Sequence, residues 1–315
     1  MTNPLLQKWS TPFEMPPFED IQAAHFPEAF IQALTHHQNE IQAIASQKQA
    51  PSFQNTLLAL EASGELLNQT SALFFNLSAS HTSPEIQAIE RDMSPKLAAH
   101  SAAMFLNAAL FERINKLHQE RTNLGLDAES IRLIERYHLD FVRAGANLKD
   151  KDRQTFANYS EKLASCFTQF SQNVLADEAA FCLVLTEADQ LKGLPDFVKS
   201  AAKQLAKERG LEQHNAHAFT LSRSSITPFM TFSERRDLRK SMWLAWCKRG
   251  ENPGAHNNET VMKEILKIRL AQARLLGYQN FSEYALADTM AQRSKRQGFA
   301  HARMDSREIK SHSRA

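Results

Sequence analysis

From Ile21 onward, apolar residues recur along the chain at intervals close to 3.6, the spacing that places them on one face of an α-helix. The longest such stretch runs from Asp150 to Asp177. Asp127 stands where an N-cap is favoured, before a helix that we expect from Ala128 to about Ala144, and Gly145 is the expected stop. The pattern therefore predicts long helices with short connections, as in mainly α proteins.

Proline and hydroxyl residues predict further helix boundaries. Thr82 and Glu85 have the spacing of a capping box, so Thr82 is the expected N-cap of the next helix. Pro95 falls inside that helical pattern and should kink or split it, because proline has no amide hydrogen to donate. Ser233 is expected to cap a helix from Glu234 to Arg249.

Two short segments have the composition of strands. Phe181–Thr186 and Ala218–Ser222 are rich in aliphatic, aromatic and β-branched residues, and a helix expected at Leu194–Arg209 lies between them. A small sheet of about two strands fits this arrangement. The predicted fold class is therefore mainly α, a multi-helix lobe with a small β element around residues 181–186 and 218–222.

The composition, with 43% apolar and 23% charged residues, is that of a soluble globular protein. The 315 residues suffice for one large domain or two ordinary ones. No apolar run approaches the roughly 18 residues of a membrane span, and Met1–Trp9 has no signal-peptide pattern, so we expect a cytoplasmic protein with no membrane partner. The first 20 residues contain four prolines and are predicted to form an extended arm.

The net charge of +2 conceals a difference between the body of the chain and its end. Residues 292–315 contain seven Lys and Arg against Asp305 and Glu308, a net of +5. Residues 1–291 then hold 30 basic and 33 acidic residues, a net of −3. The body lacks the basic surface of a nucleic-acid-binding protein, so we expect no nucleic-acid partner; such a function would rest on the tail alone.

None of the twelve histidines is followed by glutamate, so the motif HExxH is absent. That motif places two imidazoles and a general base on one helical face, which is what a catalytic zinc site requires. His214 and His217 have i,i+3 spacing before a strand and are a minor alternative for a metal site. His36 and His37 are adjacent and point to different sides of a helix, which indicates a solvated pair.

The remaining candidate chemistry is sparse. Cys166, Cys182 and Cys247 are odd in number and far apart, which indicates neither a disulfide framework nor a thiolate zinc site. Ser222–Ser225 is predicted to be a polar loop with no base nearby in the sequence. The residues alone therefore predict no catalytic residue and no metal ligand, and the substrate-binding residues stay unknown.

Seven segments, spread in order over about 290 residues, carry a resemblance to a known family. They are Asn3–Leu6, Pro16–Phe18, His25–Phe30, Asn55–Leu67, Gly125–Leu133, Leu191–Pro195 and Leu276–Ala291. Together these segments resemble the zinc oligopeptidase family of thimet oligopeptidase, oligopeptidase A and the bacterial peptidyl-dipeptidases (Dcp), and they are most similar to the peptidyl-dipeptidase branch. The resemblance covers nearly the whole chain.

The resemblance implies a mainly helical molecule of two lobes with a deep channel, in which short peptides are hydrolysed. In the peptidyl-dipeptidase branch the products are C-terminal dipeptides. It also implies a zinc ion, held by the two histidines of HExxH and a later glutamate, with the HExxH glutamate as general base. Those residues lie in the second half of the family sequence and none is matched here. This chain is therefore expected to be the N-terminal lobe, without a cofactor of its own and inactive alone.

After Ala291 the resemblance ends, and residues 292–315 are predicted to be a basic, disordered tail. When the residues from Gln292 onward are reverse-translated and read one nucleotide further along, one choice of codons yields an amphipathic helix of the family's kind. We therefore hypothesise a frameshift near Ala291. The expected domains are an arm over residues 1–20, a helical lobe over 21–291 and the tail over 292–315.

Two other functions remain open at this point. The chain could be a non-catalytic helical protein that binds peptides or a partner without cleavage. It could also be one half of a split enzyme, with the missing C-terminal lobe encoded separately and docking onto it.

Overall fold

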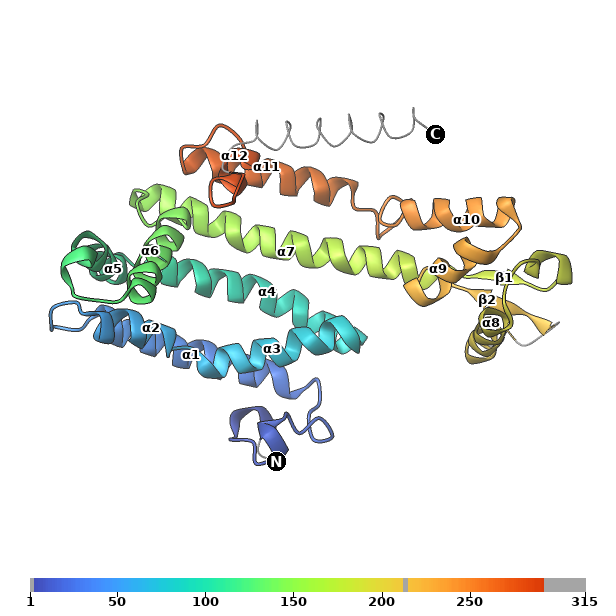
Figure 1. The fold of residues 1–315 in the computed structure, drawn as a ribbon, viewed down its shortest axis with the longest axis horizontal. Coiled ribbons are helices and arrows are strands. Elements are labelled where there is room, and N and C mark those ends of the chain that lie inside the picture. The colour runs from blue at the N-terminus through green and yellow to red at the C-terminus, as the bar shows by residue number, and fades with distance from the viewer. Residues whose placement is uncertain (1–2, 212–214, 292–315) are drawn as a thin grey trace. The chain divides into compact units, whose positions relative to one another are not determined.

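The computed structural model describes residues 3–211 and 215–291. They divide into two compact units: the first comprises the described residues before Cys166 and after Glu264, and the second comprises Cys166–Glu264. Helices dominate both units, and the one sheet among the described residues has two short strands (Figure 1). The predicted mainly α fold class is confirmed. The domain boundaries at residues 20 and 291 stay predictions, and the tail over 292–315 lies outside the described residues.

The first unit is built from helices alone. Two long helices, α7 and α11, pass from one unit into the other. The helices of the first unit are α1 (His25–Ala45), α2 (Ala59–Glu61), α3 (Glu65–Ser80), α4 (Pro84–Phe105), α5 (Ala108–Glu120), α6 (Ala128–Arg143), the first part of α7 (Asp150–Ala180), the last part of α11 (Glu259–Leu275) and α12 (Phe281–Leu286).

The second unit contains the sheet. Besides the remaining parts of α7 and α11, its elements are β1 (Leu183–Leu185), α8 (Asp196–Glu208), β2 (His217–Phe219), α9 (Arg223–Phe232) and α10 (Arg236–Cys247). The strands pair antiparallel, with Leu183 opposite Phe219 and Leu185 opposite His217. The two predicted strands are thus confirmed in position, but each is only three residues long. The second strand ends early because the Thr220 amide donates to Ser225 Oγ at 3.0 Å instead of continuing the ladder.

Packed phenylalanines hold α1 and α3 of the first unit together. Phe26 and Phe30 on α1 both meet the ring of Phe74 on α3 edge to face, with ring centroids 5.1 and 5.3 Å apart. All three are fully buried, and each buried side chain of this size stabilises the fold by about 2–3 kcal/mol. Leu5, in the short 3₁₀ turn Pro4–Leu6, enters the same cluster and fixes the first residues of the chain to α1.

The helix boundaries show which capping predictions were correct. Asp127 caps α6 by accepting from the Ser130 amide at 2.7 Å, and Gly145 follows the helix with a φ of +96°. Both predictions are confirmed. The N-cap of α4 is Ser83 rather than Thr82, because Pro84 occupies the first helical position and the residue before it must be the cap.

Two other local predictions were wrong, and a third was wrong in part. Helix α4 is not split at Pro95, because a single missing hydrogen bond is tolerated inside a helix of 22 residues; a kink there stays a prediction. Ser222–Ser225 is not a loop, since Ser222 is the N-cap of α9 and the other three residues are helical. The helix predicted from Glu234 begins at Arg236 with Arg235 as its N-cap.

The segment Leu276–Ala291, which carries part of the family resemblance, is bound to α6. Arg136 donates to Asp288 Oδ2 at 2.8 Å. Arg143 donates to the Tyr284 carbonyl at 3.0 Å, and its guanidinium lies over the Tyr284 ring, 4.6 Å from the centroid. Charged and aromatic contacts therefore hold α12 on the first unit.

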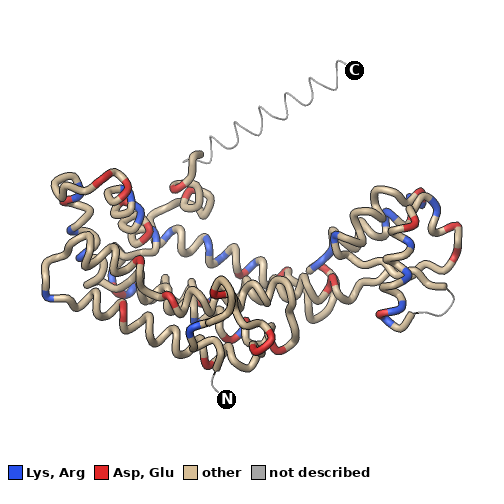
Figure 2. The backbone as a smooth tube through the Cα atoms, turned by 60° about the horizontal axis from the view of Figure 1, so that its bottom comes forward, with Lys and Arg blue, Asp and Glu red and all other residues tan. Residues whose placement is uncertain are grey.

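The charges are mixed in both units: basic and acidic residues alternate along the described tube, with no long stretch of one sign (Figure 2). Within the described residues, no helix combines the length and the apolarity that crossing a bilayer demands. Cys166 and Cys182 are half-buried and Cys247 is exposed, and none of the three forms a disulfide with another described residue.

Candidate functional site

The described residues do not contain the donor set of a zinc site. Nowhere in residues 3–211 and 215–291 do three or more His, Cys, Asp or Glu side chains gather in a way that could hold a metal ion. His217 lies in β2 with only 7% of its surface exposed, and its Nδ1 has no hydrogen-bond partner among the described residues. His214 lies outside the described residues, so the paired metal site considered for these two histidines stays untested.

The interpretation of His36 and His37 as a solvated pair is wrong for one of them. His36 is exposed, with Nδ1 3.5 Å from Glu40 Oε1. His37 is half-buried, and its Nδ1 lies 2.9 Å from His100 Nε2 on α4. Burial lowers the pKa of both His37 and His100 below the usual value of 6.5, so both favour the neutral form.

An apolar pocket in the second unit is the candidate ligand site. Its volume is about 260 Å³, and α8, β2 and the start of α9 form its walls. Pockets lined mainly by apolar groups, with a few polar groups at one side, are where proteins usually bind small ligands. The apolar lining residues are Phe197, Val198, Ala201, Ala202, Leu205, Ala218, Phe219 and Pro228.

Hydroxyl groups line the polar side of this pocket. Thr220 Oγ1 lies 3.1 Å from Ser222 Oγ, and Ser222 Oγ lies 3.3 Å from Ser224 Oγ. Ser225 also lines the pocket, and its Oγ accepts a hydrogen bond from the Thr220 amide. The arrangement suits an apolar side chain in the pocket beside a polar group that exchanges hydrogen bonds with these hydroxyls, as a short peptide would offer.

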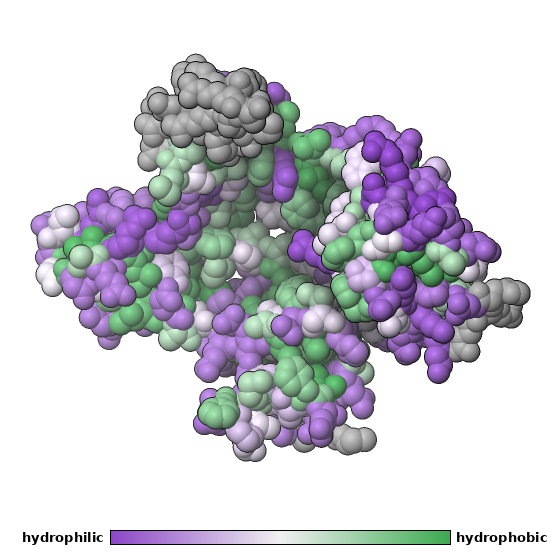
Figure 3. Space-filling view, turned by 45° about the vertical axis from the view of Figure 1, so that its right-hand side comes forward, coloured by the Kyte–Doolittle hydropathy of each residue, from purple (hydrophilic) through white to green (hydrophobic). Residues whose placement is uncertain are grey.

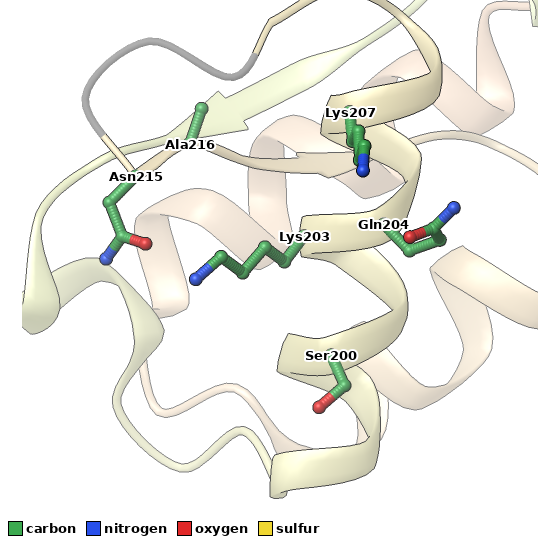
Figure 4. Close-up of a pocket in the computed structure, with 6 residues that line it drawn as sticks. All are labelled: Ser200, Lys203, Gln204, Lys207, Asn215 and Ala216. Carbon is green, nitrogen blue, oxygen red and sulfur yellow. The ribbon is translucent and has the colours of Figure 1, made fainter.

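A wider, basic pocket lies on another face of α8 (Figure 4). It encloses about 580 Å³ and is lined by Ser200, Lys203, Gln204, Lys207, Asn215 and Ala216. Lys203 extends toward Asn215, and Lys207 lies one helical turn further along (Figure 4). Neither lysine forms an ion pair with another described residue. All of the lining side chains except Ala216 are exposed, so this is a shallow surface site.

The first unit has a polar pocket of about 420 Å³ beside the arm. Glu14 from the turn around Pro12, Glu40 from α1 and Glu65 from the start of α3 line this pocket, while Lys8 and His36 supply the opposite charge. These groups neutralise one another in part, and the pocket presents no nucleophile with a base at hydrogen-bond distance among its lining residues.

Two functional groupings were missed by sequence reasoning. The contact between His37 and His100 joins residues 63 positions apart, and no spacing rule connects them. Arg113 did carry a signal: it falls on the apolar stripe of α5 with Leu110, Ile114 and Leu117, and a charged residue at such a position predicts a buried polar contact. Neither grouping has the composition of a hydrolytic site.

The comparison with protein families finds one match. The pattern described as Peptidase family M3 matches residues 229–309. The match begins inside α9 and covers α10, α11 and α12 among the described residues. Its last part, residues 292–309, lies outside them.

Curated relatives match nearly the whole chain. Dipeptidyl carboxypeptidase of Salmonella typhimurium is 36% identical over 290 residues, and that of Escherichia coli is 35% identical over 289 residues. Oligopeptidase A of Escherichia coli is 28% identical over 296 residues. These alignments cover 92–93% of the chain, but the chain spans only 42% of the length of each relative.

Proposed function

We propose, on the premise that this chain is a relative of the peptidases of family M3, that it forms the N-terminal helical part of a peptidyl-dipeptidase, an enzyme that releases dipeptides from the C-terminus of short peptides. The observation that carries this proposal is the 36% identity to a dipeptidyl carboxypeptidase over 92% of the chain. The mainly helical fold agrees with the architecture expected from the resemblance.

Zinc would be held by residues outside this sequence. HExxH is absent from all 315 residues, and the described side chains do not form a metal-binding group. When bound in the longer enzyme, the ion would activate water for attack on the peptide bond. This chain would contribute helices that position the peptide, and it would not hydrolyse peptides alone.

The remaining part of such an enzyme is the proposed partner. Large apolar side chains are exposed on the helices, among them Leu266 at 66%, Phe197 at 64% and Trp243 at 53%. In the space-filling view, hydrophobic residues lie at the surface among hydrophilic ones (Figure 3). A contiguous exposed apolar patch is typical of a surface that a partner covers, and the proposal is that these side chains belong to such surfaces. Short peptides complete the set of partners, and the proposed location is the cytoplasm.

A second function, peptide binding without cleavage, is supported by the apolar pocket of the second unit. Its 260 Å³ volume and its hydroxyl groups suit one apolar side chain and an adjacent peptide group. Such binding would need no metal. It would be measured by fluorescence anisotropy of a labelled peptide with an apolar side chain, in the presence of a chelator.

A chimera tests the main proposal. In it, this chain through Ala291 replaces the matched segment of the Salmonella typhimurium dipeptidyl carboxypeptidase, and the rest of that enzyme follows. We expect the chimera to release C-terminal dipeptides when loaded with zinc. A folded, zinc-loaded chimera that binds peptide but leaves it uncut would contradict the proposal, and the unmodified Salmonella enzyme serves as the control.

A further inference from the structure

The side chains of three segments that are far apart in sequence meet at His37 in the first unit. His37 Nδ1 lies 2.9 Å from His100 Nε2 on α4, and His37 Nε2 lies 3.3 Å from Ser63 Oγ in the turn between α2 and α3. Ser63 Oγ in turn donates to the Leu60 carbonyl at 2.7 Å. One imidazole therefore links α1 both to α4 and to the α2–α3 turn.

The hydrogen bonds fix the direction of donation. Because the Ser63 hydroxyl hydrogen is used on the Leu60 carbonyl, Ser63 Oγ is left to accept from His37 Nε2. With its hydrogen on Nε2, a neutral His37 has a lone pair on Nδ1, which accepts from His100 Nε2. The chain of donors runs from His100 through His37 and Ser63 to Leu60.

The lack of a side chain at Gly64 leaves room for the imidazole of His37. Its φ of +75° is unfavourable for other residues, and a Cβ at this position would lie 3.0 Å from His37 Nε2. The Gly64 amide donates to Glu40 Oε2 at 2.8 Å, which binds the same turn to α1 a second time. The site of the pair is therefore built by backbone geometry as well as by the two rings.

We propose that His37 and His100 form a proton-sharing pair that accepts one proton without changing its geometry, and that a second proton separates α1 from α4 and from the α2–α3 turn. A single added proton resides on His100 Nδ1, and His100 Nε2 still donates to His37 Nδ1. A second proton must occupy His37 Nδ1. Two N–H groups would then face each other across 2.9 Å, and the two imidazolium charges would repel.

Burial, more than the surrounding charges, favours the neutral pair. It is the main cause that lowers the pKa of His37 and of His100, and the charge of a protonated His37 lowers the pKa of His100 further. Glu40 opposes this effect at His37, while His36 adds to it. His36 and Glu40 of α1 line one pocket with Lys8 and Glu14 of the arm and Glu65 of α3, and Lys96 of α4, one helical turn before His100, is paired with Asp92.

The pH dependence follows from the direction of these shifts. In the unfolded chain both histidines protonate near the usual pKa of 6.5, whereas in the folded chain they protonate at lower pH. Well above pH 6.5 the two histidines are neutral in both the folded and the unfolded chain, so the full stability of the first unit is present. As the pH falls below 6.5, the unfolded chain gains protons first, so the first unit loses stability.

The test is NMR of the whole chain labelled with ¹³Cε1,¹⁵N-histidine, between pH 5 and 8, with wild type compared with His100→Gln and with His81→Gln as the control. His81 is exposed at the end of α3 and belongs to no pair. We expect two successive titration steps at His37 and His100 and a coupling between their ring nitrogens that survives the first step and disappears with the second. In His100→Gln no second imidazolium can form, so the pH midpoint of the His37 titration should rise. His81→Gln should leave that midpoint unchanged.

Two results would overturn the proposal. One is independent, single-step titration of His37 and His100, each with the same curve as His81, in a chain that circular dichroism shows to be folded. The other is a His37 midpoint in His100→Gln identical to that of wild type.

Discussion

Arg113 and Asn55 are joined by a hydrogen bond of 2.8 Å, from Nη2 to Oδ1, in the buried space between α5 and the π-helical turn Phe53–Leu58. The same guanidinium donates to the carbonyls of Gln47 and Gln49 at 3.1 and 3.0 Å. Asn55 itself closes the start of the turn by accepting from the Ser52 amide at 2.8 Å. One buried cation thus organises the connection that leads from α1 to α2, with neutral oxygens as its hydrogen-bond acceptors.

Replacing Arg113 by methionine should destabilise the first unit by about 2–3 kcal/mol, because several buried oxygens lose a charged donor. Arg113→Lys keeps the charge, but an ammonium group cannot donate to all of the acceptors that the planar guanidinium reaches. The loss in unfolding free energy should therefore lie between those of wild type and Arg113→Met. Urea unfolding followed by circular dichroism measures both. Equal unfolding free energies for Arg113→Met and wild type would show that the hydrogen bonds of Arg113 make no net contribution to stability.

Gly64→Ala should be more destabilising than Gly125→Ala. Both glycines have a positive φ, of +75° and +66°, so each substitution carries about 1–2 kcal/mol of backbone strain. At Gly125 an added Cβ meets nothing within 4 Å, whereas at Gly64 it presses on the ring of His37. The difference between the two unfolding free energies therefore isolates the His37 contact, and equal losses would contradict this account.

A second histidine pair should add to the pH dependence. His118 and His138 stack with ring centroids 3.8 Å apart, and burial is the main cause that lowers the pKa of each below 6.5. Since the unfolded chain protonates first, stability should fall as the pH drops below 6.5. His138→Phe removes one titrating group and keeps an aromatic ring beside Phe111, so unfolding free energy plotted against pH should be flatter. A slope unchanged between pH 5 and 7 would contradict this.

Elements of the fold were predicted correctly where their sequence signals lie within one helix. Asp127, Gly145 and the start of α7 were predicted from the sequence because caps and periodicity act within one helix. Helix α9 was missed because Ser222–Ser225 and Pro228 have the composition of a loop, and burial of Ile226 and Phe229 against the sheet outweighs that tendency.

The candidate sites were less predictable than the fold. The apolar pocket combines residues of α8 with Phe219 and the hydroxyls near α9, and only the folded chain brings these together. The division into two units falls inside α7 and α11, where the sequence shows no break in helical periodicity. The family resemblance, in contrast, was carried by short segments and is supported by the relatives found.

Filling the apolar pocket should weaken peptide binding. Ala201 lies at its wall, and Ala201→Trp would place an indole where the peptide side chain is proposed to bind. Ser200→Trp is the matched control, because Ser200 is the next residue on the same helix and lines the other pocket. We expect a loss of about tenfold in affinity for Ala201→Trp, the equivalent of about 1.4 kcal/mol, and little change for the control. Equal affinities would exclude this pocket as the binding site.

The central claim, that this chain is the non-metal part of a zinc peptidase, is tested most directly by measuring zinc content and dipeptide release on the purified 315-residue chain. The substrate is a short peptide with a free C-terminus, and the Salmonella typhimurium dipeptidyl carboxypeptidase is the positive control. We predict a chain that holds no stoichiometric zinc and does not cleave the peptide. About one zinc ion per chain, together with release of a C-terminal dipeptide, would contradict the account and would direct attention to His214 and His217.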